Sequence, residues 1–179
     1  KYSNSLEERI TLMPETDIDV VGNWTEIKLN ILKEYSQAYA KILSKHSYLK
    51  HYYIDGFAGA GLHISKTTGQ EIEGSPSIAL NLQPGFSHYH FIDLDGNRAE
   101  QLRSLAAGRS DVTVYDGDCN SILLNEVFPQ CQRKDHRRAL CLLDPYKLNP
   151  DWNVVQTAGS MESIEIFLNF MIMDANMNV

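Results

Sequence analysis

Hydrophobic and polar positions follow a helical period in the first part of the chain. Apolar side chains recur at Trp24, Ile27, Ile31, Tyr35, Tyr39 and Ile42, and Leu29, Leu32 and Leu43 widen this stripe. The spacing predicts a helix that is capped by Asn23. We assign Trp24 to the core, with a contact to a cofactor as the alternative. Residues 1–22 have no clear periodicity, so we interpret them as an N-terminal arm before one domain at 23–179.

Short apolar runs follow this helix. They predict five strands, at residues 52–54, 88–92, 112–115, 139–143 and 164–170. Helical patterns at 75–82 and 96–105 lie between strands, whereas residues 62–74 have the composition of an inserted loop. The alternation predicts an α/β fold of Rossmann-like type, a mostly parallel twisted sheet with helices on both faces. Since such a sheet usually continues, we expect further segments beyond Val179.

Composition agrees with one globular domain. The chain has 179 residues, of which 43% are hydrophobic and 22% are charged, a balance typical of globular proteins. No stretch approaches the roughly 20 apolar residues that span a bilayer, and residues 1–10 lack the pattern of a signal peptide. We therefore expect a cytoplasmic protein without a membrane partner.

Charge disfavours a protein that binds nucleic acid unaided, and cysteine content disfavours a protein held together by disulfides or a metal. The net charge is −7, whereas proteins that bind nucleic acid unaided are usually basic. A basic face or a positively charged partner would still allow a nucleic-acid substrate. Cys119, Cys131 and Cys141 form no C-x-x-C pair and are odd in number. This pattern argues against a disulfide framework or a metal site and favours free thiols in a reducing cytoplasm.

Acidic residues stand at or just after the carboxyl ends of four predicted strands. They are Asp55, Asp93, Asp118 and Asp144. In open parallel sheets, ligands bind beyond this edge. The acids therefore predict a binding site there, although acids also serve as ordinary turn residues at strand ends.

The segment Y-I-D-G-F-A-G-A-G at 53–61 narrows the choice of ligand. Its glycines fail the G-x-G-x-x-G fingerprint of dinucleotide sites, and the chain lacks the G-x-x-x-x-G-K-S/T phosphate loop. Asp55 before the loop would repel a pyrophosphate and attract a cation. S-adenosylmethionine carries an ammonium and a sulfonium and no phosphate, and a loop without side chains lets the backbone approach it closely.

The other acids then have expected roles around this cofactor. Asp93 could accept hydrogen bonds from both ribose hydroxyls, as an acid does in nucleotide-binding folds. Asp118 could accept from the adenine amino group, with Cys119 or Asn120 lining the ring. The alternative for Asp118 is a turn or a helix cap.

Four segments in this order resemble the class I S-adenosylmethionine-dependent methyltransferases. They are YIDGFAGAG, FIDLD at 91–95, GDCN at 117–120 and LLDPY at 142–146. F-A-G-A-G is similar to the glycine loop of amino-directed DNA and RNA methyltransferases. D-P-Y is similar to their D/N-P-P-Y motif, with one proline missing. The resemblance implies the class I methyltransferase fold and places Phe57, Ala58, Gly59, Gly61 and Leu94 at the cofactor.

The chain is more specifically similar to the three-Cys-motif partner family, a bacterial methyltransferase-like group. The matching features are a W-x-x-x-K helix at Trp24 and Lys28, Asp93, the Leu143-Asp144-Pro145-Tyr146 segment and Trp152. The resemblance covers about residues 20–172, and Lys147 departs from the glycine of the family pattern. It implies a companion protein that bears three cysteines, which are not the three of this chain.

The resemblance also implies roles at the reacting centre. Asp144 would accept a hydrogen bond from the methyl acceptor, Pro145 would present a carbonyl, and Tyr146 would stack on a base. Lys28 would pair with the carboxylate of the cofactor, with a solvated surface position as the alternative. The alternative for Asp-Pro-Tyr is a plain turn after a buried strand.

Two functions from different classes remain after this comparison. The first is an S-adenosylmethionine-dependent methyltransferase that acts on an amino group of a nucleic acid or a related substrate. The second is a non-catalytic module that binds S-adenosylmethionine or a nucleoside and acts with a three-Cys-motif partner protein. A nicotinamide-dependent oxidoreductase is disfavoured by the incomplete glycine fingerprint.

Overall fold

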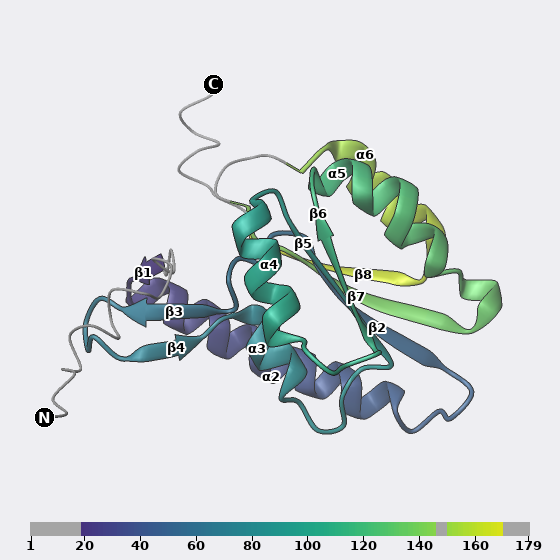
Figure 1. Cartoon of the computed structure of the whole chain (residues 1–179). Helices are drawn as coiled ribbons and strands as arrows, with labels where there is room; N and C mark the ends of the chain where they lie inside the picture. Colours follow the sequence, from purple (N-terminus) through teal and green to yellow (C-terminus); the bar gives the residue numbers. More distant parts are fainter. Residues whose placement is uncertain (1–18, 146–149, 170–179) are drawn as a thin grey trace, which may run out of the picture.

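The computed structural model describes residues 19–145 and 150–169, and its centre is a five-stranded parallel sheet (Figure 1). The strand order is β6-β5-β2-β7-β8, and every neighbouring pair is parallel. The strands are β2 (Lys50–Asp55), β5 (His88–Asp93), β6 (Val112–Asp116), β7 (Arg137–Leu143) and β8 (Ile164–Leu168). The predicted α/β fold with a parallel sheet is confirmed, and Phe170, which was predicted to end the last strand, lies outside the described residues.

Helices cover both faces of this sheet (Figure 1). On one side lie α2 (Asn23–Leu43), α3 (Ser75–Leu80) and α4 (Gly96–Leu105). On the other lie α5 (Cys119–Ile122), with π and 3-10 turns at Leu123–Val127 and Phe128–Gln130, and α6 (Trp152–Met161). A further 3-10 turn spans Arg133–Asp135. The region of α6 was not predicted from the sequence.

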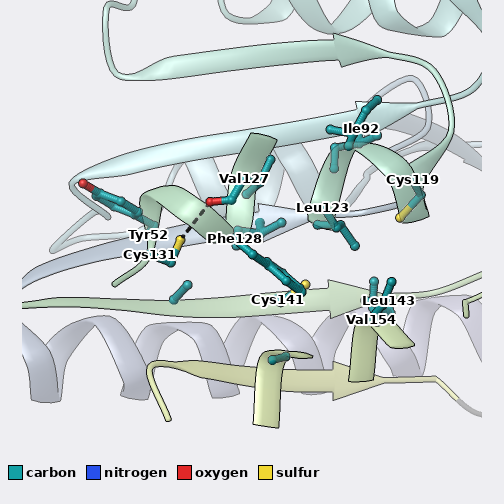
Figure 2. Packing of buried hydrophobic residues seen from close by; sticks show 14 residues of the cluster. Tyr52, Ile92, Cys119, Leu123, Val127, Phe128, Cys131, Cys141, Leu143 and Val154 are labelled. Carbon is teal, nitrogen blue, oxygen red and sulfur yellow. Dashed lines mark hydrogen bonds between the residues drawn. The ribbon is translucent and has the colours of Figure 1, made fainter. Parts of the chain in front are cut away.

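Side chains of the central strand alternate between two cores. Tyr52 and Ile54 pack with α5 and α6, whereas Tyr53 packs with α2, α3 and α4. Figure 2 shows the first of these clusters, in which Cys119, Cys131 and Cys141 lie among aliphatic and aromatic side chains. Because both faces are covered, the strands read as nearly continuous apolar runs.

A second, three-stranded sheet corrects two sequence predictions. β3 (Leu62–Ser65) and β4 (Glu71–Glu73) form an antiparallel hairpin where an unstructured inserted loop was expected. β1 (Asp19–Val21), the end of the predicted N-terminal arm, pairs in parallel with β3. These strands are only three or four residues long, so their apolar pattern is too short to be distinguished from a loop.

Helix α2 forms as predicted but packs through a different face. Trp24 is 67% exposed and Ile31 is 53% exposed, so the prediction that Trp24 belongs to the core is wrong. Leu32, Ser36 and Ala40 face the interior instead. Periodicity shows that a helix has an apolar stripe, but small side chains such as Ser36 and Ala40 can also face a core, where they let the backbone come close to the sheet. The helix begins at Asn23 with Gly22 at the cap position, one residue earlier than predicted.

All three cysteines are free and buried. Within residues 19–145 and 150–169, no group of His, Cys, Asp and Glu side chains is arranged to hold a metal ion. In the same residues, no helix combines the length and the hydropathy needed to cross a bilayer.

Candidate functional site

The predicted acids lie along one edge of the sheet. β2 ends at Asp55 and β5 ends at Asp93, while Asp118 and Asp144 follow the ends of β6 and β7. Because these strands are parallel, their carboxyl ends all reach the same edge. The four acids differ in their surroundings, however, and among them Asp144 alone belongs to the lining of the cavity described below.

Asp93 is bonded to the glycine loop. One of its carboxylate oxygens accepts from the backbone N–H of Gly59 at 2.8 Å, and the other accepts from that of Asp95 at 2.9 Å. The side chain is only 9% exposed. Asp93 therefore joins the end of β5 to the loop that follows β2, and it fixes where the loop stands.

Three positions of the loop require glycine, for different structural reasons. Gly59 and Gly61 have φ angles of 64° and 81°, in the region that favours glycine. Gly56 has no such requirement, but a Cβ atom there would lie 2.8 Å from the sulfur of Cys119 and 2.9 Å from Leu143. The loop thus needs glycine at Gly56 for close packing on the core, and at Gly59 and Gly61 for its turn.

Asp55 is enclosed beneath the loop rather than exposed to a ligand. It is fully buried, and burial raises its pKa to about 7. The N–H of Phe57 donates to one carboxylate oxygen at 3.3 Å, and hydrogen bonds from Ser75 and Phe57 lower the pKa in part against the larger effect of burial. Asp55 does not line the adjacent cavity. The expectation that its charge faces a cationic ligand is therefore wrong, because the loop covers the carboxylate.

A cavity of about 430 Å³ lies between α2, the glycine loop and the ends of β7 and β8. Phe57, Ala58 and Gly59 line it from the loop, and Asp144 and Pro145 line it from the end of β7. Its volume falls within the usual range for sites that bind small molecules, about 300–1,000 Å³. The cavity joins the predicted cofactor loop to the predicted reacting centre.

An ion pair crosses this cavity. The ammonium of Lys28 donates to both carboxylate oxygens of Asp144, at 2.7 and 3.0 Å. The side-chain amide of Asn169, just after β8, donates to Asp144 at 2.6 Å. Lys28 was predicted to meet the carboxylate of a cofactor, and the structure places its ammonium on Asp144 instead. Tyr146 lies outside the described residues.

The predicted adenine contacts lie away from the cavity lining. Asp118 is exposed and accepts from the N–H of Ser121 at 2.8 Å, so it caps α5, which was the alternative reading of this residue. The thiol of Cys119 packs in the core, where burial raises its pKa to about 12. Leu94 is 77% exposed beside Asp93. Among these residues, Leu94 has the apolar surface that is open to a planar ligand.

Sequence reasoning missed two side chains at the cavity. Asn169 follows the end of β8 just as the acids follow the other strands, but the predicted strand extended to residue 170 and therefore included it. Trp24 lines the cavity although it was assigned to the core. Its position four residues before Lys28 puts both on one side of the helix, but only the packing of α2 shows which side that is.

Comparisons with known proteins support the fold and leave the activity open. No protein-family model matches the chain, and no curated protein matches it. The chain is similar to the crystal structure of protein LPL1258 from Legionella pneumophila str. Philadelphia 1, which is described by the family model DUF519. The match has a TM-score of 0.59 and 14% sequence identity, over 78% of this chain and 67% of that chain. At this identity the likeness shows the fold alone.

Proposed function

We propose that the protein is an S-adenosylmethionine-dependent methyltransferase of the class I fold, acting on an amino group of a nucleic acid or a related substrate. One observation supports this proposal best. The cavity of about 430 Å³ is lined by both the glycine loop and Asp144-Pro145, from the ends of the neighbouring strands β2 and β7. A methyl donor at the loop and an acceptor at Asp144 would therefore share one space.

Residues of the loop edge fit the proposed cofactor. A carboxylate has about four acceptor positions, and Asp93 uses two of them for Gly59 and Asp95. Two positions remain for ribose hydroxyls. Leu94 offers an exposed apolar side chain for the adenine ring. When bound, S-adenosylmethionine supplies a methyl group that is already activated, so the protein has mainly to position the acceptor.

Asp144 and Pro145 are suited to orient an amine. The carboxylate can accept an N–H of the acceptor and so direct the lone pair of its nitrogen toward the donor. The carbonyl of Pro145 can accept a second N–H, and Tyr146 would stack on the ring that carries the amine. We place this reaction in the cytoplasm, where the three buried thiols would stay reduced.

A specific observation also favours the non-catalytic alternative. Lys28 and Asn169 already occupy the carboxylate of Asp144, and the net charge of −7 is unfavourable for binding nucleic acid without help. A module that binds the cofactor and docks a three-Cys-motif partner protein would have the same cavity. Methyl transfer separates the two functions.

The test combines a binding assay with a transfer assay. S-adenosylmethionine should raise the melting temperature, because a ligand that binds only the folded state stabilises it, whereas NAD should leave it unchanged. Labelled methyl transfer to total nucleic acid or cell extract should occur and should be lost in Asp144→Ala. A melting temperature unaffected by S-adenosylmethionine would contradict both functions. Binding without transfer would favour the alternative module.

A further inference from the structure

We propose that the first two turns of α2 form one wall of the acceptor site, in which Lys28 positions Asp144 and Trp24 stacks on the ring that carries the amine. This inference rests on the proposed function and adds two residues to the acceptor half of the site. It replaces the expected role of Lys28 at the cofactor. Two observations support this inference: the contact between Lys28 and Asp144, and the exposure of Trp24 at the same cavity.

The hydrogen bonds that Asp144 accepts from described residues leave one acceptor position of its carboxylate unused. Its Oδ1 accepts from Lys28 at 3.0 Å and from Asn169 at 2.6 Å, whereas Oδ2 accepts from Lys28 at 2.7 Å. Since each carboxylate oxygen can accept about two hydrogen bonds, the described residues fill Oδ1 and leave one position on Oδ2. The side chain of Asp144 is 33% exposed, so that position can be reached by the N–H of an acceptor. Lys28 and Asn169 thus restrict the rotation of the carboxylate that would receive it.

Methyl transfer asks this carboxylate to accept hydrogen bonds and to hold the amine in place. The ammonium of Lys28 lies within 3.0 Å of both carboxylate oxygens and so fixes their position. The lone pair of a neutral amine would form the new N–C bond while the C–S bond of the donor breaks and S-adenosylhomocysteine leaves, and the methylated nitrogen would then lose one proton to water. The amine therefore needs orientation and no prior removal of a proton. Lys28 is therefore a positioning residue that acts through Asp144.

Trp24 provides the aromatic surface of this wall. It precedes Lys28 by four residues, about one helical turn, and so lies on the same side of α2. Its side chain is 67% exposed although it lines the cavity. An exposed indole beside a hydrogen-bonding carboxylate offers an incoming ring both stacking and an acceptor for its amine.

The role of Lys28 is tested with one matched control. Lys28→Met should lower kcat on the order of 100-fold, because small displacements of reacting groups have effects of that size. The dissociation constant of S-adenosylmethionine should change by less than about twofold, since no cofactor contact is removed. Lys28→Arg should recover part of the rate. Lys33→Met, at an exposed position of the same helix, should behave as wild type.

Two results would overturn this role. A roughly tenfold weaker affinity for S-adenosylmethionine in Lys28→Met would make Lys28 a cofactor contact. Equal kcat in Lys28→Met and Lys33→Met would remove it from the site. A double-mutant cycle of Lys28→Met with Asp144→Asn, followed by unfolding, reports the contact without any acceptor: non-additive effects are expected, and additive effects would contradict it.

Trp24 is tested by fluorescence, with Trp152 as its control. Trp152 is 70% exposed on α6 and does not line the cavity, and these are the two tryptophans of the chain. S-adenosylhomocysteine is first bound in the donor half of the site. Cytidine should then quench the emission of Trp24, measured in Trp152→Phe, and should leave the emission of Trp152, measured in Trp24→Phe, unchanged. Uridine, which has no exocyclic amine, should bind less tightly. The same response in both variants would overturn the role of Trp24.

Failure of the proposed function has a different signature. In that case the wild-type protein itself would transfer no methyl group to any acceptor, whatever stands at position 28. Failure of the further inference alone would leave wild-type transfer intact, with Lys28→Met and Trp24→Phe as active as their controls.

Discussion

The backbone N–H of Gly59 donates a hydrogen bond of 2.8 Å to the carboxylate of Asp93. This bond joins two segments that are 34 residues apart in the sequence. Gly59 has a left-handed backbone conformation, with φ of 64°, and its N–H bonds to the end of β5, the neighbour of β2 in the sheet. The loop and the acid of the candidate cofactor site are therefore one structural unit.

Removal of this acceptor should affect both stability and binding. Asp93→Ala leaves the N–H groups of Gly59 and Asp95 without their partner, and each loss of this kind costs about 1–3 kcal/mol. We expect the free energy of unfolding in urea to fall by that order and the affinity for S-adenosylmethionine to fall several-fold. Asp116→Ala, at the exposed end of the neighbouring strand β6, serves as the control. Unchanged affinity in Asp93→Ala would remove Asp93 from the cofactor site.

Burial of Asp55 predicts a pH dependence of stability. Its pKa is raised from 3.8 to about 7, chiefly because burial disfavours the charged form. Between these values the folded chain holds a proton that the unfolded chain releases, so this group's stabilisation is complete below about pH 4 and is lost as the pH rises through about 7. Asp55→Asn stays neutral throughout and lacks this loss.

The measurement is the difference in unfolding free energy between Asp55→Asn and wild type. The unfolding free energy of the variant, relative to that of wild type, should increase between about pH 4 and about pH 7 by at most about 1.4 kcal/mol per pH unit. Above about pH 7 the difference should be constant. The other titrating groups contribute nearly equally to the stability of the variant and of wild type, so their contributions largely cancel in this difference. A difference that does not vary with pH would show that Asp55 ionises normally in the folded protein.

Close packing beneath the loop predicts that Gly56→Ala is destabilising. The added Cβ would meet the sulfur of Cys119 at 2.8 Å and Leu143 at 2.9 Å, and overpacking of this kind costs about 1–3 kcal/mol. Gly159→Ala, where nothing lies within 4 Å of the new Cβ, should be neutral or slightly stabilising in its helix. Cys119→Ala should relieve part of the Gly56→Ala defect. Equal unfolding midpoints for Gly56→Ala and Gly159→Ala would contradict this packing.

Thiol reactivity distinguishes a core Cys119 from one that lines an open site. Burial raises the pKa of Cys119 and Cys131 to about 12 and that of Cys141 well above its usual value. Because the thiolate is the reactive form, the native protein should react negligibly with a disulfide reagent at mild alkaline pH. All three thiols should react in denaturant. If Cys119 instead reacted fast and S-adenosylhomocysteine blocked this reaction, Cys119 would lie at the cofactor.

Sequence reasoning was most successful where local pattern and strand direction were sufficient. Alternating strands and helices predicted the parallel sheet, and the positions of Asp55, Asp93 and Asp144 at strand ends predicted the edge at which they lie. These inferences need only the periodicity of side chains and the rule that parallel strands end together. They hold whatever packs against each helix.

Contacts between distant segments could not be predicted in this way. Lys28 bonds to Asp144 across 116 residues, and the loop that covers Asp55 turns a predicted ligand contact into a buried acid. The sequence alone determined that acids and glycines gather at one edge of an α/β sheet, because local periodicity and chain direction suffice for that. Tertiary structure decided which carboxylates face the cavity and that Trp24 stands at its rim, because burial and partners depend on how α2 and the loop pack on the sheet.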